Sequence, residues 1–333
     1  MKKILVTGGA GFIGSNFANI NQDRYKITVL DNLQMGDPDN IYDKNKVRFI
    51  QGDAGELSDL KKCGDHFDYV IHLAGTSTAP KFQGDGFVEG YVNSVKSFVQ
   101  TLEFARSAGA KKFLYASTSS LYGNNPVPLT EDQRITPPNH YSVTKFLYEN
   151  CSLCYHKVYP EMEIIGFRFM SVYGPNEEAK GPYANVISQF IWDIARGRAP
   201  IIYGDGSQYR DFTNVRDVVQ GITRVIETEK FIGNDVFNIG TGEYASLNDI
   251  VKMINEELVK REKNPAKAEH IPNPIKENYI QSQYADISKI KNILGYEPSV
   301  KIKDGIAEQI ANARIEKIRK TSSDILREKK IRV

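Results

Sequence analysis

The sequence is poor in cysteine, with only Cys63, Cys151 and Cys154 among 333 residues. So small and odd a number excludes the disulfide framework of a small secreted domain and predicts a cytoplasmic protein. Cys151 and Cys154 have the CxxC spacing of a redox or zinc pair, but a zinc site needs a second ligand pair. The sequence has no other CxxC and no HxxxH. We therefore expect no metal site, and both cysteines to pack in a buried helix.

Long apolar runs are also absent. No segment approaches the 18 or more consecutive apolar residues of a membrane-spanning helix. The first six residues resemble the start of a signal peptide, but Thr7, Gly8 and Gly9 end the apolar run. The sequence therefore predicts no membrane partner.

The chain has no excess of one charge: 43 basic residues face 41 acidic ones, for a formal net charge of +2. Nucleic-acid binders usually carry a concentrated basic face, so no nucleic-acid partner is expected. Only residues 316–333 are predominantly basic, through Lys317, Arg319, Lys320, Arg327, Lys329, Lys330 and Arg332. We expect a solvated helix end or a frayed tail there, with contact to an anionic surface as the alternative.

The remaining composition, 41% hydrophobic and 25% charged, is that of an ordinary globular protein. In the first 170 residues short apolar runs alternate with helical patterns. The expected strands are residues 3–7, 26–30, 47–51, 69–73, 112–117 and 163–169, and the expected helices are 12–21, 57–62, 88–107 and 141–158. The alternation predicts an α/β fold, a Rossmann-type doubly wound parallel sheet. Residues 1–170 would form this domain and 171–315 a smaller α/β substrate lobe that returns to the sheet, followed by the basic tail 316–333.

A glycine-rich turn follows the first strand, with Gly8, Gly11 and Gly14 at a spacing of three and a helix after them. Such a turn lets backbone amides approach a pyrophosphate at a helix N-terminus. Asp31 ends the second strand, where a carboxylate hydrogen-bonds the ribose 2′-hydroxyl of NAD and repels the 2′-phosphate of NADP. Residues 32–36 supply no Arg or Lys to compensate. The pattern predicts NAD as the cofactor.

Tyr141 and Lys145 are four residues apart at the start of a predicted helix and so share one face. The ammonium can stabilise a Tyr141 phenolate, which would then act as a base. The strand that ends near residue 117 leads into the hydroxyl cluster Thr118, Ser119 and Ser120, which can hydrogen-bond a substrate alcohol or carbonyl.

Together these segments resemble the extended short-chain dehydrogenases/reductases of the nucleotide-sugar epimerase and dehydratase group, over about residues 3–312. The matching segments are TGGAGFIGS, DN at 31–32, GD at 52–53, HLAG at 72–75, YVNSV, STSSLYG, YSVTK, GFRFMSVYGP, YGDGSQYRDF, VRDVV, FNIGTG and YADISK.

The resemblance implies a set of cofactor contacts. The amides of Phe12 and Ile13 would join the glycine turn on the pyrophosphate. Asp31 and Asn32 would hold the adenosine ribose, Asp53 and Ala54 would flank adenine, Leu73, Ala74 and Gly75 would line the dinucleotide path, and Lys145 would bridge the nicotinamide ribose and Tyr141. Thr118 takes the position of the catalytic Ser/Thr.

The resemblance also implies substrate contacts. Ser119, Ser171, Lys180, Asn185, Arg210 and Lys276 fall at substrate-binding positions, the last two where related enzymes hold the nucleotide diphosphate. Lys276 replaces the usual Arg. It keeps the positive charge, but a lysine lacks the bidentate fork of a guanidinium. Ser171 replaces the usual Asn, and Met170 the usual aromatic residue, which weakens the expected sugar-diphosphate contacts in that turn.

Ser119 and Ser120 occupy the places where dehydratases of this group carry an Asp-Glu pair and decarboxylases a Glu. Without those carboxylates, the resemblance favours NAD-dependent C4 epimerisation of a UDP-hexose, of the UDP-glucose/UDP-galactose type, through a 4-keto intermediate. A heptose 6-epimerase that uses Lys180 is one alternative, although such enzymes typically prefer NADP. Another dehydratase or reductase, and a catalytically silent dinucleotide sensor, are the others. The resemblance further implies a homodimer built on helices 88–107 and 141–159.

Overall fold

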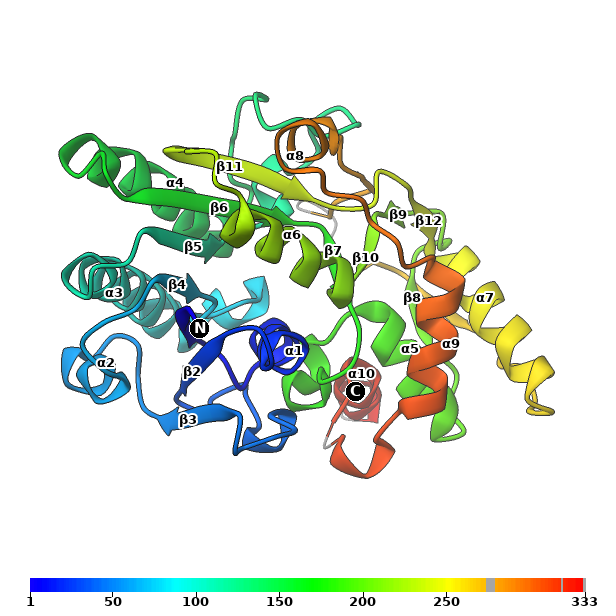
Figure 1. The fold of residues 1–333 in the computed structure, drawn as a ribbon. Coiled ribbons are helices and arrows are strands. Elements are labelled where there is room, and N and C mark those ends of the chain that lie inside the picture. The colour runs from blue at the N-terminus through cyan, green and yellow to red at the C-terminus, as the bar shows by residue number, and fades with distance from the viewer. Residues whose placement is uncertain (274–278, 319, 332–333) are drawn as a thin grey trace.

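The structure, a computed structural model, describes residues 1–273, 279–318 and 320–331. Seven parallel strands form one sheet in the order β11-β6-β5-β4-β1-β2-β3 (Figure 1). They are β1 (Lys3–Thr7), β2 (Lys26–Asp31), β3 (Val47–Gln51), β4 (Tyr69–His72), β5 (Lys112–Ala116), β6 (Glu163–Phe169) and β11 (Asn234–Ile239). The first six end within one residue of their expected bounds. The seventh brings the chain back to the sheet.

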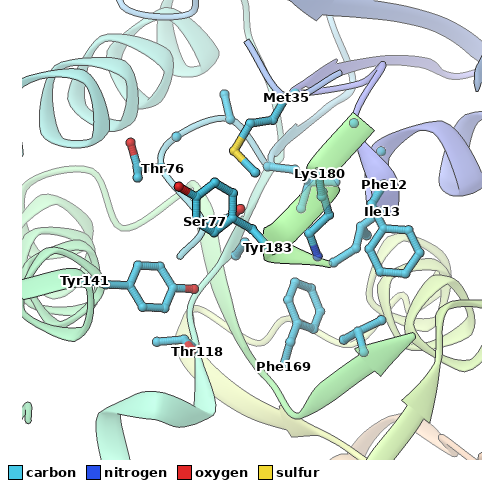
Figure 2. A pocket seen from close by; sticks show the side chains of 18 of the residues that line it. Phe12, Ile13, Met35, Thr76, Ser77, Thr118, Tyr141, Phe169, Lys180 and Tyr183 are labelled. Atoms are coloured by element: carbon cyan, nitrogen blue, oxygen red, sulfur yellow. The ribbon is translucent and has the colours of Figure 1, made fainter. Parts of the chain in front are cut away.

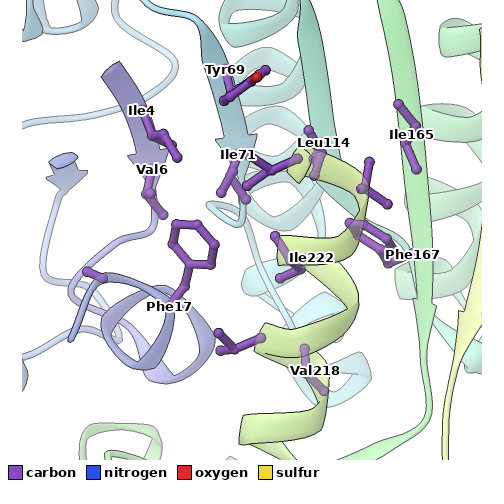
Figure 3. Packing of buried hydrophobic residues seen from close by; sticks show 14 of the residues in the cluster. Ile4, Val6, Phe17, Tyr69, Ile71, Leu114, Ile165, Phe167, Val218 and Ile222 are labelled. Atoms are coloured by element: carbon purple, nitrogen blue, oxygen red, sulfur yellow. The ribbon is translucent and has the colours of Figure 1, made fainter. Parts of the chain in front are cut away.

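Helices cover both faces of this sheet. One face carries α1 (Phe12–Asn21), α6 (Val215–Glu227) and α8 (Ser288–Leu294), and the other carries α2 (Leu57–Cys63), α3 (Gly86–Ser107) and α4 (His140–Val158). Alternate side chains of a strand point to opposite faces. Ile4 and Val6 of β1 pack with Phe17 of α1 and Ile222 of α6, as Figure 3 shows, while Leu5 packs against the other layer. The prediction of a doubly wound Rossmann-type sheet is confirmed.

The second lobe is built from shorter elements. Its strands are β7 (Ser171–Tyr173), β8 (Ile201–Tyr203), β9 (Tyr209–Arg210), β10 (Phe212–Asn214), β12 (Ala245–Ser246), β13 (Glu269–Ile271) and β14 (Ser282–Gln283). Its helices are α5 (Val186–Ala195), α7 (Leu247–Lys260), α9 (Ile302–Asn312) and α10 (Ser322–Ile331). Trp192, Ile250 and Ile306 from three of these helices lie in one core.

Five 3-10 helices connect the larger elements: η1 (Pro38–Asn40), η2 (Ala79–Phe82), η3 (Ser119–Tyr122), η4 (Glu178–Tyr183) and η5 (Ile315–Lys317). Two of them, η3 and η4, follow strands β5 and β7 of the two lobes, so they bring polar side chains to the region where the lobes meet.

The C-terminal segment packs on α5, where the sequence predicts a solvated helix end or a frayed tail. The buried hydroxyls of Thr321 and Ser323 donate to the Asp193 carboxylate over 3.1 and 2.7 Å. Arg319 and Arg332 of this basic segment lie outside the described residues.

The three cysteines are unbridged. Cys63 is buried, Cys151 is half-buried and Cys154 is exposed. The expectation of burial is wrong for Cys154, because Lys145, Tyr148 and Ser152 form the buried stripe of α4 and Cys154 lies off it. Within the described ranges, no helix is long and apolar enough to cross a membrane.

Candidate active site

A cavity of about 470 Å³ lies at the carboxyl ends of the central strands, between the sheet and the second lobe. It is lined by all of the site residues expected from the sequence that the structure describes. These are Gly8, Gly11, Phe12, Ile13, Gly14, Asp31, Asn32, Asp53, Ala54, Leu73, Ala74, Gly75, Thr118, Ser119, Tyr141, Lys145, Ser171, Lys180, Asn185 and Arg210. The remaining one, Lys276, lies outside the described residues.

The glycine turn is packed so closely that side chains are excluded from it. Gly8 has a φ of +70°, and a Cβ there would lie 2.7 Å from the amide nitrogen of Ala74. A Cβ on Gly14 would lie 2.4 Å from the carbonyl oxygen of Gly8. Among the residues that the structure describes, no side chain caps the N-terminus of α1, so its first amides are free to bind an anionic group.

Asp31 is held rigidly at the end of β2. Its carboxylate accepts hydrogen bonds from the amides of Ala10 and Leu33 over 3.0 and 2.8 Å. Burial raises the pKa of Asp31, and these amides oppose the change. Beside it, the Asn32 amide donates to the Asp53 carboxylate over 3.0 Å. These side chains form a polar wall able to receive ribose hydroxyls.

Tyr141 and Thr118 meet on one side of the cavity (Figure 2). Tyr141 lies in the first turn of α4, which Asn139 caps by accepting the Ser142 amide over 2.9 Å. Thr118 follows β5 and lines the same side of the cavity as Tyr141. Burial raises the pKa of Tyr141, and the nearby Thr118 hydroxyl opposes the change because it stabilises the phenolate.

Lys145 lies one turn further along α4 and is 4% exposed. It has no carboxylate partner in the part of the chain that the structure describes. Burial lowers its pKa to about 7. The ammonium therefore lies in a dry environment one helical turn from Tyr141. In such an environment its charge would act strongly on a Tyr141 phenolate.

The opposite wall comes from η4, which presents Lys180 and Tyr183 (Figure 2). The Lys180 ammonium lies 2.8 Å from the carboxylate of the buried Glu177 and 5.0 Å from the centre of the Phe12 ring. Its side chain is only 19% exposed, whereas a solvated loop lysine would be largely exposed. Lys180 thus faces Tyr141 across the cavity.

Arg210 and Asn185 complete the second-lobe side. The Arg210 guanidinium donates to the backbone carbonyls of Tyr209 and Gln281 over 2.8 and 3.1 Å. Asn185 donates to the Val172 carbonyl over 3.0 Å and lies 3.4 Å from the Ser171 hydroxyl. Asn185 thus reaches the turn in which Ser171 replaces the usual Asn of related enzymes.

Several residues that line the cavity were not predicted from the sequence. They include Met35, Thr76, Ser77, Phe169, Tyr183 and Gln283. Tyr183 is two residues from Asn185, so its place in the same loop was a usable signal. Met35 and Gln283 belong to no recognised pattern, and their place depends on the packing of distant segments.

Comparison with known proteins shows the family of the chain. The model of the NAD dependent epimerase/dehydratase family matches residues 4–240. A putative UDP-glucose 4-epimerase of Methanocaldococcus jannaschii is 33% identical over 307 residues, which cover 91% of this chain and 95% of that protein.

Two solved structures show the same fold. A UDP-N-acetylglucosamine 4-epimerase from Methanobrevibacter ruminantium M1 is 29% identical with a TM-score of 0.85, and the match covers 93% of this chain and 97% of that one. The ADP-L-glycero-D-manno-heptose-6-epimerase of Helicobacter pylori is 27% identical with a TM-score of 0.81, over 95% and 96% of the two chains. The expected enzyme class and NAD dependence agree with these matches. The chain belongs to the NAD dependent epimerase/dehydratase family, among its nucleotide-sugar epimerases.

Proposed function

We propose that the protein interconverts the C4 epimers of a UDP-hexose with NAD as its cofactor. The observation that carries this proposal is that one cavity holds the Tyr141 and Thr118 pair, the buried Lys145, the glycine turn and Arg210. A dinucleotide and a nucleotide-diphosphate sugar would thus meet beside Tyr141, the proposed general base. The relative from M. jannaschii is named a putative UDP-glucose 4-epimerase, which also supports reaction at C4.

The residues present fit NAD. The glycine turn packs closely against the backbone of Leu73 and Ala74, and the amides of Phe12 and Ile13 at the start of α1 are free to bind a pyrophosphate. Asp31 would accept hydrogen bonds from the adenosine ribose, and Lys145 would donate to the nicotinamide ribose. The lining cations within the described residues are Lys145, Lys180 and Arg210, so none stands beside Asp31 to bind a 2′-phosphate.

The reaction follows from the positions of these side chains. Tyr141 takes the proton of the 4-hydroxyl, Thr118 hydrogen-bonds the same oxygen, and Lys145 stabilises the phenolate. Held by the glycine turn and Asp31, NAD would supply the hydride chemistry at C4, the oxidation of the alcohol and the later reduction of the ketone. The 4-keto sugar turns in the cavity and presents its other face, and Tyr141 gives the proton back to the oxygen.

The distribution of carboxylates argues against elimination. Asp31 and Asp53 are the lining carboxylates among the described residues, and both lie at the end proposed for adenosine. Ser119 and Ser120 stand beside Thr118 instead, and hydroxyls are weak acids and bases for the loss of water. Lys180 is neutralised by Glu177, so this wall also offers no unpaired charge for a uronic acid.

A panel of nucleotide sugars tests the proposal. Incubation with UDP-, GDP-, ADP- and dTDP-sugars, followed by NMR of the products, should show C4 epimers of a UDP-hexose. The Tyr141→Phe variant should lose about 10³-fold in turnover while it still binds NAD. Near-wild-type turnover of Tyr141→Phe would overturn the assignment.

The position of Lys180 favours a second candidate function, epimerisation at C6 of a nucleotide-linked heptose, the activity named for the H. pylori neighbour. Lys180 and Tyr141 lie on opposite sides of the cavity and would serve as two proton-transfer groups (Figure 2). Lys180→Met separates the candidates. Under C4 epimerisation it should weaken substrate binding and change kcat by less than about threefold, whereas a catalytic Lys180 would lose about 10²-fold or more in kcat.

We further propose a homodimer. Along α3, Val88, Val92 and Val99 form an exposed aliphatic stripe, and on α4 Val143 and Leu147 extend it. These two helices pack side by side, so their stripes form one apolar face. A second copy that meets the same face across a two-fold axis would bury both stripes in a four-helix bundle.

The three free thiols and the absence of a disulfide among the described residues suit a reducing compartment. This supports a cytoplasmic location.

A further inference from the structure

The Lys145 ammonium rests on an aromatic face. Its Nζ atom lies 4.4 Å from the centre of the Tyr148 ring, which is three residues further along α4. Within about 6 Å of a ring centre, a cation is attracted to the negative face of the π system. No carboxylate of the described chain pairs with this ammonium, so the ring is its stabilising neighbour.

The Tyr148 ring is fixed by three contacts. It stacks on Phe98 of α3 at 4.0 Å and 12°, and its hydroxyl donates to the Ser94 carbonyl over 2.7 Å. His72 of β4 meets it edge-on at 6.1 Å. Tyr148 has no exposed surface, so the ring cannot turn away from Lys145.

The same ring supports the cofactor wall. Gly75 lines the cavity, and a Cβ placed there would lie 3.2 Å from the Tyr148 hydroxyl oxygen. Tyr148 therefore fills the space between the buried layer of α3 and the wall beside Lys145.

The ionisable residues near Lys145 within the described chain supply no negative charge, and burial is the cause of its lowered pKa. Tyr141 and Tyr148 come from α4, and both are neutral because burial raises their pKa values. His72 comes from β4, and burial together with Lys145 lowers its pKa to about 3. Thr118, which follows β5, does not ionise. The ring face is therefore the feature that offsets burial of the ammonium.

We infer that Tyr148 is a positioning residue that keeps the Lys145 ammonium charged and directed at Tyr141 through its ring face. This inference rests on the proposed function for its catalytic meaning. It predicts that aromatic character at position 148 matters and that the Tyr148 hydroxyl does not. The Ser94 carbonyl keeps a second donor, the Ser97 hydroxyl at 3.0 Å, when the Tyr148 hydroxyl is removed.

Titration of Lys145 tests the inference without any substrate. In protein labelled with ¹³C at the lysine ε carbon, the Lys145 signal is assigned by its loss in Lys145→Met. Tyr148→Phe should leave the pKa of Lys145 unchanged, because the ring face is kept. Tyr148→Met should lower the pKa of Lys145 by roughly one pH unit, because a cation-π contact stabilises the ammonium by an amount of that order. An unchanged pKa in Tyr148→Met would overturn the inference.

A graded series removes the risk that Tyr148→Met disturbs the fold. Replacement of Tyr148 by 4-fluoro- and 3,5-difluorophenylalanine keeps the ring shape and weakens its negative face stepwise. The pKa of Lys145 should fall in the same order, and the alkaline limb of the kcat profile should move with it. A Lys145 pKa that stays constant across the series contradicts the inference. So does an alkaline limb of the kcat profile that fails to move with this pKa in an active enzyme. If the wild type turns over no nucleotide sugar, the proposed function fails, and the titration still decides the role of Tyr148.

Discussion

Lys145 shows how the arrangement required for function reduces stability. In the folded chain the pKa of Lys145 is about 7, whereas an exposed lysine has a pKa of 10.5. Between these values the unfolded chain holds a proton that the folded chain has released, so stability rises with pH over this range. The penalty from Lys145 is therefore complete below pH 7 and disappears as the pH approaches 10.5.

Lys145→Met should accordingly stabilise the cofactor-free protein and abolish turnover. We expect its thermal midpoint to exceed that of the wild type by about 2 °C or more at pH 6.5, with a gap that narrows towards pH 10. Scanning calorimetry at several pH values measures this gap. A midpoint below the wild type at pH 6.5 would show that the ammonium is well compensated in the folded state.

At the residue scale, motifs in the sequence were enough to predict residues on both sides of the cavity. Gly8, Asp31 and Tyr141 belong to recognisable patterns because their chemistry requires fixed spacings along the chain. The cation-π contact of Lys145 was not predicted. It depends on Phe98, which lies 50 residues from Tyr148 and stacks on it only in the folded chain.

At the element scale, Arg314, which follows α9, supports the 3-10 helix η4 that presents Lys180 and Tyr183. Arg314 pairs with Glu178 of η4 over 2.7 Å and also donates to Asn176 and, over 3.2 Å, to Asn40 of η1. Asn40 belongs to the sheet domain and Glu178 to the second lobe, so one guanidinium connects the two lobes.

Arg314→Met should therefore loosen η4. We expect a several-fold higher KM for the sugar nucleotide with little change in NAD affinity, because the glycine turn lies on another element. Steady-state kinetics and NAD titration measure the two effects. Lys320→Met is the matched control, since its pair with Glu328 is exposed and contributes about 0–1 kcal/mol. Equal effects of the two variants would refute a specific role for Arg314.

The two halves of the chain differed in how well their elements could be predicted. The central strands of the large sheet are buried on both faces, so they appear in the sequence as short apolar runs, such as ILV in β1 and FLYA in β5. Strands such as Tyr209–Arg210 and Ser282–Gln283 are too short to show a period, and they pair across more than 70 residues of sequence. Only the folded chain brings them together.

At the scale of the whole molecule, the apolar face on α3 and α4 predicts assembly. Val92→Glu places a charge in the middle of the proposed interface and should shift the protein from dimer to monomer in light scattering. Val259→Glu on α7 is the matched control, since Val259 is also a helical valine and is 59% exposed. A wild type that is monomeric at micromolar concentration would rule out the dimer.

The proposed reaction requires that C4 of the sugar is oxidised and reduced again within a single cavity. The most direct test is the incubation of UDP-[4-²H]glucose with the protein in ordinary water, with NMR of the product. We expect UDP-galactose that retains deuterium at C4, because the hydride leaves and returns without exchange with solvent. Protium at C4 of the product, or no inversion at C4 of this or any other UDP-hexose, would contradict it.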